Sequence, residues 1–191
     1  MGSSYLANPL VFVIGTLFDL YILAVLLRLI LQQVRADFYN PVSQFLVKVT
    51  QPVLRPLRRV IPGMGGIDWA AVVLIIALQF IALIVLSLIR FGEMLPLDYL
   101  VVRTVYELVE LILNVYLFAI IIQAILSWVQ PGYNPATALL ESITYPVLRP
   151  FRSVIPPIGG LDLSPLVAIL AIQVLKMLVL PPIAQFAAAV G

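Results

Sequence analysis

Four long apolar stretches constrain this chain more than any other feature. They cover residues 10–31, 69–89, 105–129 and 163–183. An α-helix needs roughly 20 mainly apolar residues to cross about 30 Å of hydrocarbon, so each stretch is a candidate span. The last stretch contains Pro181 and Pro182, and the apolar residues beyond them either extend the span or lie along the interface. We therefore predict an all-α membrane protein with four transmembrane helices.

The composition agrees with this class and excludes others. Hydrophobic residues make up 63% of the 191 residues and charged residues 10%, whereas charged residues make up about 25% of a soluble domain. The absence of cysteine and histidine excludes disulfides, sites for zinc or haem built from those side chains, and Ser-His-Asp catalysis. We predict no enzymatic activity, no cofactor and no metal site. The net charge of +2 gives no indication of a nucleic-acid partner.

The distribution of Lys and Arg predicts the orientation. The two segments that join spans one to two and three to four carry seven of these residues, and the connection between spans two and three carries only Arg90 and Arg103. Basic loops stay in the cytoplasm. We expect a multi-pass protein of the bacterial inner (plasma) membrane with both long loops cytoplasmic and both termini outside. The first stretch lacks a basic leader and exceeds a signal-peptide core, so we expect it to remain as a span.

An internal duplication organises the chain. With a shift of 94 positions, residues 39–68 align without a gap with residues 133–162, and seventeen of the thirty pairs are identical. Each copy contains a span, a loop and a second span, so equivalent positions point the same way across the membrane. We predict two parallel tandem repeats, 1–94 and 95–191, related by a pseudo-two-fold axis along the membrane normal.

Each loop begins with a predicted amphipathic helix. Asn40-Pro41 and Asn134-Pro135 supply a helix N-cap followed by proline at the first helical position. Apolar residues then recur at spacings of three and four, at Val42, Phe45, Leu46, Val49 and Val53 in the first copy and at Ala136, Leu139, Leu140, Ile143 and Val147 in the second. We expect a helix of roughly ten residues in the cytoplasmic headgroup plane or against the bundle, with a re-entrant dip left open.

Prolines are expected to end these helices. Pro52 with Pro56, and Pro146 with Pro150, lack backbone N–H groups and crowd the preceding turn. The remainder of each loop, as far as Pro62 and Pro156, is predicted to be extended or turning.

The same segments present arginines at the level of the lipid phosphates. The candidate residues for binding lipid or a partner are Arg55, Arg58, Arg59, Arg149 and Arg152. A guanidinium binds an oxyanion through two parallel hydrogen bonds, so an anionic lipid is the expected ligand. The simpler interpretation is that these arginines only anchor the loops on the cytoplasmic side and donate hydrogen bonds to loop carbonyls. A protein partner and an anion permeation site are further alternatives.

Both loops end in two glycines and an aspartate. These residues are Gly65, Gly66 and Asp68 in the first copy and Gly159, Gly160 and Asp162 in the second. The glycines give the backbone freedom before the next span, and each aspartate is placed to accept the free N–H groups of that span. An ion pair with Arg58 or Arg152 is a second, compatible role.

Five polar side chains are expected within the membrane, namely Asp19, Gln79, Glu110, Gln173 and Lys176. The two glutamines are equivalent in the repeat, and we expect them to bond across helix interfaces, with solute passage as the alternative. Charges at depth are costly, so we expect a structural buried pair, with a proton-linked or ion-conducting path through Asp19, Glu110 and Lys176 as the alternative. Lys176 lies at a depth close to that of Glu110, with Asp19 as the competing partner. Asp19, Arg28 and Lys176 have no charged equivalent 94 positions away, where Leu113, Ile122 and Ala82 stand. Arg28 can snorkel to the headgroups without a special role.

The doubled motif resembles that of the YggT family. In both copies NP is followed by T-x-P-V-L-R-P-x-R-x-V-I-P and then by GG-x-D, and residues 162–165 match a D-x-S-P ending from which residues 68–71 depart. The resemblance implies a bacterial inner-membrane protein without established enzymatic activity. It also implies kinship with YlmG-like proteins, which are associated with cell division, nucleoid distribution, cytochrome b6 maturation and osmotic tolerance.

Two functions follow from these features. The first is a noncatalytic scaffold or assembly factor, and the second is a small channel or transporter that contributes to ion balance under osmotic stress. Residues 69–89 and 111–129 lack the Gly or Pro of the broken helices in transporters, so we favour the scaffold. The expected partners are anionic membrane lipids and envelope or cell-division proteins, and a homo-oligomer is left open.

Overall fold

The computed structural model describes residues 3–129, 134–156 and 162–190, and six α-helices account for nearly all of them. The helices are α1 (Ser3–Gln33), α2 (Pro41–Val60), α3 (Trp69–Phe91), α4 (Leu97–Val129), α5 (Pro135–Val154) and α6 (Ser164–Val190). Helices α1, α3, α4 and α6 are long and apolar enough to cross a membrane, which confirms the four predicted spans. Helix α4 begins at Leu97, well before the expected residue 105. Polar residues such as Asp98 and Arg103 lower the hydropathy of its first turns, although these turns are helical.

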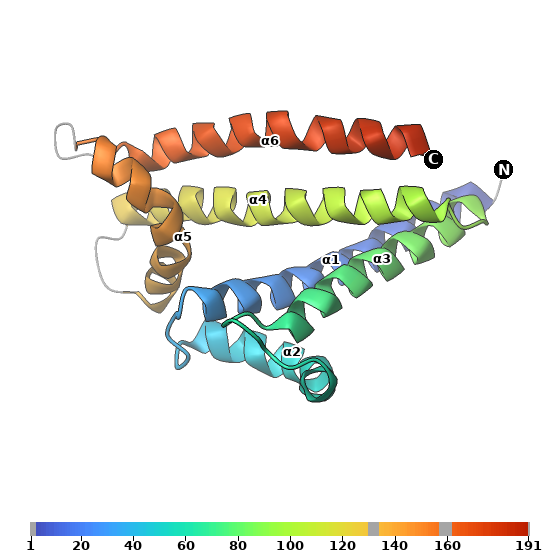
Figure 1. Ribbon diagram of the computed structural model, residues 1–191, viewed down its shortest axis with the longest axis horizontal. Coiled ribbons are helices and arrows are strands. Elements are labelled where there is room, and N and C mark those ends of the chain that lie inside the picture. The colour runs from blue at the N-terminus through green and yellow to red at the C-terminus, as the bar shows by residue number, and fades with distance from the viewer. Residues whose placement is uncertain (1–2, 130–133, 157–161, 191) are drawn as a thin grey trace.

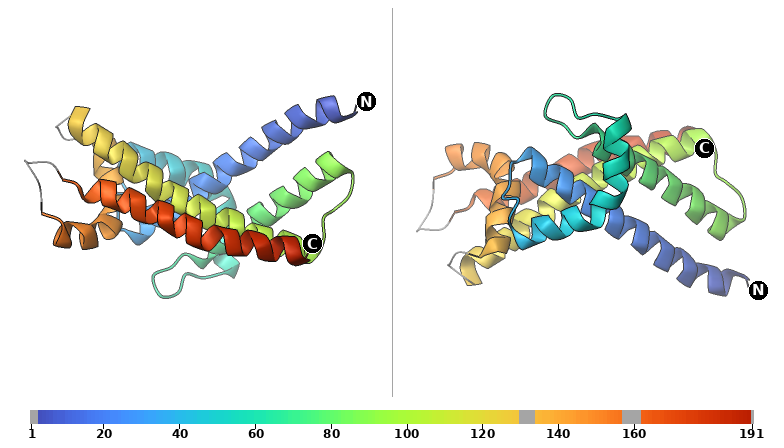
Figure 2. Two further views of the ribbon diagram at one scale, coloured as in Figure 1. Left: turned by 90° about the horizontal axis from the view of Figure 1, so that it is seen from above. Right: turned by 90° about the horizontal axis from the view of Figure 1, so that it is seen from below.

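The helices are arranged so that equivalent parts of the two repeats lie at the same end. Figure 1 shows both termini and the α3–α4 connection at one end of the bundle, with α5 crossing the ends of α4 and α6 at the other. Helix α2 packs against α1 and α3. The N-terminal half of α1 diverges from the neighbouring spans in both views of Figure 2.

Within each repeat the two spans pack against each other, α1 with α3 and α4 with α6. The larger buried cluster joins Ile22 and Val25 of α1 to Ala71 of α3 and also takes in Leu139 and Ile143 of α5. Helix α5 therefore contributes to the core of the first repeat as well as its own. Helix α2 contributes Leu46 and Leu54 to the larger cluster but no residue to the cluster of the second repeat, so the two amphipathic helices have different surroundings despite their similar sequences.

The prediction that prolines end the amphipathic helices is wrong. Helices α2 and α5 each contain 20 residues, twice the expected length, and continue through Pro52 and Pro56 or Pro146 and Pro150. Prolines four residues apart lie on the same side of a helix. Their missing N–H groups therefore weaken only one side of the ladder, which bends the helix instead of ending it. Figure 1 shows this change of direction along α2.

The fourth span also continues beyond the expected end at residue 183. Helix α6 passes through Pro181 and Pro182 and ends at Val190, so the apolar tail extends the span. Both prolines are exposed on the surface of the helix. At such positions the rings remove two backbone donors and displace no packed neighbour.

The helix starts predicted from Asn-Pro are confirmed. Asn40 Oδ1 accepts from Val42 N at 3.0 Å, and Asn134 Oδ1 accepts from Ala136 N at 2.9 Å. Asn40 Nδ2 also donates to the carbonyl oxygen of Pro135 at 2.7 Å. This last bond ties the beginnings of α2 and α5 together, so the N-cap of one repeat holds the other repeat in place.

Candidate functional site

The loop between α2 and α3 closes on a tight two-glycine turn. Met64 and Ile67 exchange backbone hydrogen bonds of 3.2 and 3.1 Å across Gly65 and Gly66. The two glycines have φ angles of 64° and 80°, which a type I′ turn requires and which residues with a Cβ rarely adopt. Gly159 and Gly160, their equivalents, lie outside the described residues. The first copy therefore uses the glycines as expected, to turn the chain back towards α3.

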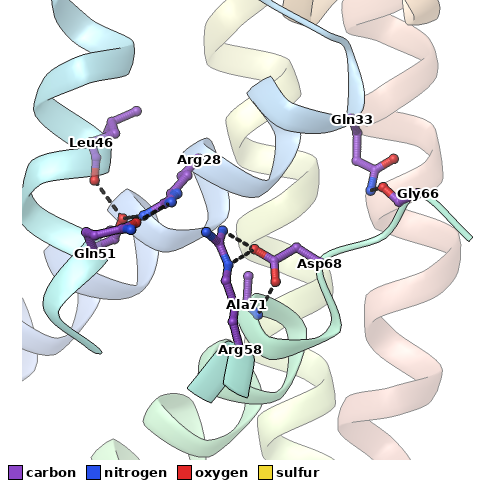
Figure 3. Close-up of polar contacts among 9 residues, drawn as sticks. Arg28, Gln33, Leu46, Gln51, Arg58, Gly66, Asp68 and Ala71 are labelled. Atoms are coloured by element: carbon purple, nitrogen blue, oxygen red, sulfur yellow. Dashed lines mark hydrogen bonds and ion pairs between the residues drawn. The ribbon is translucent and has the colours of Figure 1, made fainter. Parts of the chain in front are cut away.

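Asp68 performs both roles considered for it. Its side chain caps α3 by accepting from Ala71 N at 3.4 Å, and Arg58 Nε donates to its other oxygen at 3.0 Å. Figure 3 shows Arg58 reaching from α2 to this carboxylate. Gln33 Nε2 donates to Gly66 O at 3.1 Å on the neighbouring side of the loop. The end of α1, the turn and the start of α3 are thus bonded into one unit.

Asp162 repeats this arrangement at a more exposed position. It accepts from Ser164 N at 2.9 Å and from Arg152 Nε at 3.0 Å. The Asp162 side chain is 43% exposed, against 5% for Asp68. Burial alone would raise the pKa of the Asp162 carboxyl, but the hydrogen bonds from Ser164 and Arg152 outweigh it and hold that pKa below its ordinary value.

This lowered pKa predicts a pH-dependent contribution to stability. The unfolded chain takes up the Asp162 proton at a higher pH than the folded chain, so the contribution is present above the ordinary aspartate pKa of about 3.9 and is lost as the pH falls. The thermal unfolding midpoint in detergent should be higher for wild type than for Asp162→Asn at pH 7, and the difference should shrink as the pH falls below about 3.9. At pH 7, Arg152→Gln should lower the unfolding midpoint by most of the amount by which Asp162→Asn lowers it. A gap between wild type and Asp162→Asn that widens on acidification would contradict this.

Arg28 does not snorkel freely, contrary to the expectation for it. Only 9% of the residue is exposed, because α2 packs over the end of α1. Its Nη1 donates to Thr50 Oγ1 at 2.7 Å. Its Nη2 donates to Gln51 Oε1 at 2.8 Å, and Figure 3 shows Arg28 beside Gln51. Thr50 Oγ1 in turn donates a hydrogen bond to Leu46 O at 2.6 Å. Arg28 therefore fastens the first span to the amphipathic helix.

The second repeat makes the same connection with a neutral group. Thr144, equivalent to Thr50, is hydrogen-bonded to the side-chain amide of Gln123. Gln123 stands 95 positions after Arg28, whereas Thr144 stands 94 after Thr50. The shift between repeats therefore changes from 95 to 94 in the connection after the first span, which is one residue shorter in the second copy.

This change of shift corrects the assignment of equivalent residues in the first spans. Asp19 corresponds to Asn114 and not to Leu113, and Arg28 corresponds to Gln123 and not to Ile122. The polar positions are thus repeated, although the charges are not. Comparing the two copies of the first span separately from the loops would have revealed this.

Lys176 finds its partners within its own repeat. Its Nζ donates to Asn114 Oδ1 at 2.7 Å and lies 3.9 Å from Glu110 Oε1. Asn114 and Glu110 are one turn apart on α4, and α4 packs directly on α6. Asp19 is exposed on α1 and makes no ion pair among the described residues, so it is not the partner of Lys176. The amide of Asn114 is the partner that the sequence analysis missed.

The two intramembrane glutamines have different surroundings. Gln79 is buried in α3, but Gln173 is exposed on α6. Neither side chain makes a hydrogen bond to another part of the described structure. Gln173 does not bond across a helix interface as expected, because α6 packs on α4 through a different face from the one that carries it. Gln79 lies in the interior as expected but makes no such bond among the described residues.

The remaining arginines of the basic loops are solvent-facing or lipid-facing. Arg55, Arg59 and Arg149 are exposed, whereas Arg58 and Arg152 are turned towards their aspartates. Three arginines also meet in a cavity of about 470 Å³ between the end of α1 and α2, which is lined by Arg28, Arg35, Arg58 and Ser43 beside apolar side chains. This cavity and the exposed side of α2 are the candidate binding surfaces.

Four apolar helices of membrane-spanning length, arranged as two copies of span, amphipathic helix and span, define a helical membrane protein built from a tandem repeat. The model of the CCB3/YggT family matches residues 7–89 and again residues 102–183. The chain belongs to this family. The two matched segments begin 95 residues apart and end 94 apart, in agreement with the change of shift seen at Arg28 and Gln123.

Relatives in other organisms match most of the chain. An uncharacterized protein of Pseudomonas aeruginosa is 49% identical over 172 residues, which cover 89% of this chain and 87% of the relative. The uncharacterized protein YggT of Escherichia coli K12 is 40% identical over 170 residues, covering 89% and 88%. The chloroplastic YlmG homolog protein 2 of Arabidopsis thaliana is 36% identical over 84 residues, covering 44% and 33%. No solved structure matches the chain, and none of these names denotes a catalytic activity.

Proposed function

We propose that this protein is a noncatalytic membrane scaffold that engages anionic lipid of the bacterial inner membrane through its basic loop segments, above all through α2. In this role the basic segments lie on the cytoplasmic side and both termini lie outside, as the distribution of Lys and Arg favours. Envelope or cell-division proteins would assemble on the surface that remains in water. The exposed side of α2 is the observation that carries the proposal.

Helix α2 has three stripes of different character. One stripe, including Leu46, Thr50 and Leu54, is buried against the neighbouring helices. A second is apolar yet exposed, formed by Val42, Phe45, Val49 and Val53, with Phe45 62% exposed. The third carries the exposed cations Lys48, Arg55 and Arg59. A helix with an uncovered apolar stripe beside a cationic one is suited to the interface of an anionic membrane.

Helix α5 lacks this exposed apolar stripe. Leu139, the equivalent of Phe45, is only 5% exposed because α5 packs between α1 and α4. Its exposed side instead carries Glu141 and Tyr145 beside Arg149. The lipid-binding role is therefore assigned chiefly to the first repeat, and α5 has the larger part in holding the two repeats together.

A fluorescent reporter on α2 tests the proposal. The chain has no cysteine, so Val49→Cys provides a unique attachment point for a bimane label in the apolar stripe. In vesicles containing phosphatidylglycerol, we expect lipids labelled with a shallow doxyl group to quench this probe, and aqueous iodide to quench it weakly. The matched control is Gln44→Cys, on an exposed polar position earlier in α2, where the pattern should reverse. Iodide quenching at Val49 equal to that at Gln44 would contradict the proposed contact with the bilayer.

The intramembrane cluster is the observation that favours a second function, the small channel or transporter. Glu110, Asn114 and Lys176 place polar groups along α4 and α6 within the apolar spans, where such groups often mark ion pathways. Reconstituted protein should move no ions if it is a scaffold. Ion flux into proteoliposomes that disappears with Lys176→Met, but persists with the exposed control Gln173→Leu, would reverse the ranking.

A further inference from the structure

The cavity between α1 and α2 contains more positive charge than its partners neutralise. Arg28 is 9% exposed, and its two acceptors are the neutral oxygens of Thr50 and Gln51. Arg58 already has Asp68 as its counterion. The described residues that line the cavity include three arginines but no carboxylate. A buried guanidinium without an anion of its own is costly, so the site favours an added anion.

Ser43 supplies a second, independent indication of a ligand. Its side chain lines the same cavity, is 7% exposed, and has a hydroxyl group with no hydrogen-bond partner among the described residues. Buried hydroxyl groups are nearly always bonded, so an unpartnered one beside three cations calls for an acceptor. An oxyanion is the acceptor that would satisfy the hydroxyl and the guanidiniums together.

Arg35 occupies a position that favours glycine. It follows the end of α1 with a φ of 52° and is the only residue other than glycine with positive φ in the described ranges. Ala36 N donates to Leu31 O at 2.9 Å and Arg35 N donates to Gln32 O at 3.2 Å, which is the hydrogen-bond pattern of a Schellman cap. Glycine would adopt this conformation without strain. The backbone is therefore strained at a residue whose side chain lines the cavity.

The second repeat lacks the same set of cations. Gln123 replaces Arg28, and the segment Gln130-Pro131-Gly132 stands where the first repeat has the four residues that begin with Arg35. Arg152 remains, paired with Asp162 as Arg58 is paired with Asp68. The excess of positive charge therefore belongs to the first repeat alone.

We propose that this cavity binds one phosphate group, that of an anionic phospholipid headgroup, between the guanidiniums of Arg28, Arg35 and Arg58 with the Ser43 hydroxyl as a further donor. Phosphate presents several acceptor oxygens to such a set of donors. Phe38, Leu46 and Val47 also line the cavity and provide apolar contact for the beginning of an acyl chain. The choice of a lipid as the source of the phosphate rests on the proposed function, whereas the phosphate site itself does not.

Titration of the purified full-length protein in a non-ionic detergent tests the inference. Dioctanoyl phosphatidylglycerol is the first probe, dioctanoyl phosphatidylcholine the zwitterionic comparison, and inorganic phosphate the soluble competitor, with bound species counted by native mass spectrometry. We expect one saturable site for phosphatidylglycerol and much weaker binding of phosphatidylcholine. Loss of a charge-assisted contact in Arg35→Gly should weaken the site about tenfold. Ser43→Ala should weaken it about fivefold.

The variants are chosen so that misfolding cannot explain a loss of binding. Arg35→Gly relieves strain and Ser43→Ala removes an unbonded hydroxyl, so both should unfold at or above the wild-type temperature. Arg90→Gln is the matched control, because it removes an exposed arginine from the last turn of α3, outside the basic loops, and should leave the site unchanged. Equal weakening by Arg90→Gln and Arg35→Gly, or no saturable binding of any probe, would overturn the inference.

The same titration separates the source of the phosphate from the existence of the site. Displacement of phosphatidylglycerol by equimolar inorganic phosphate, with the same dependence on Arg35, would support the phosphate site and make a soluble phosphate its ligand. If phosphate binds to the cavity but the Val49 reporter lies in water, the phosphate site is supported and the proposed function is contradicted. A Val49 reporter buried in the bilayer, together with cavity variants that bind phosphatidylglycerol as tightly as wild type, would support the proposed function and overturn the phosphate site.

Discussion

Asp68→Ala is expected to lower the free energy of unfolding by about 2–4 kcal/mol, because it removes a helix cap and leaves Arg58 without its counterion. The Asp68 side chain is 5% exposed, so water replaces neither interaction well. Asp162→Ala should also reduce the amount of folded protein, but by about 1 kcal/mol, since its ion pair is far more exposed and is screened by solvent. Chemical unfolding of the purified proteins in detergent measures both.

An asparagine variant separates the two contributions of Asp68. Asp68→Asn retains an oxygen for the cap at Ala71 and loses the charge that pairs with Arg58, so its stability should lie between those of wild type and Asp68→Ala. Wild-type stability of Asp68→Ala, or equal losses at Asp68 and Asp162, would refute the structural role assigned to the loop.

Thr50→Val is expected to destabilise the protein by about 1–3 kcal/mol, because it leaves the buried guanidinium of Arg28 without one of its acceptors. Valine has nearly the shape of threonine, so packing around this fully buried residue should change little. Thr144→Val is the matched variant in the second repeat. It should cost less, about 1 kcal/mol, because the partner there is the neutral amide of Gln123.

A double-mutant cycle identifies the interaction. Arg28→Gln gives the first repeat the pairing of the second, so Thr50→Val should cost less in that background than in wild type. Additive losses would show that Thr50 stabilises the protein by packing alone and not through Arg28.

Several features of the site were accessible from residue pattern alone because they depend on neighbouring residues. The Asn-Pro helix starts, the turn at Gly65 and Gly66, and the capping by Asp68 all arise within a few positions of the chain. The behaviour of the prolines was not accessible in this way. Whether Pro52 and Pro56 end a helix or only bend it depends on the packing of α2 against α1 and α3, which compensates for the lost hydrogen bonds.

Four spans, a doubled span–helix–span unit and two basic loops follow from the order of residues, since hydrophobic length, repeated motifs and local capping leave few alternatives in a membrane. Packing between the repeats, in contrast, leaves α2 with an exposed apolar stripe, places α5 in the core and buries Arg28 beside Arg35 and Arg58. These outcomes depend on how two similar repeats pack against each other. Two copies of one sequence pattern cannot occupy the same environment once one of them lies between the repeats.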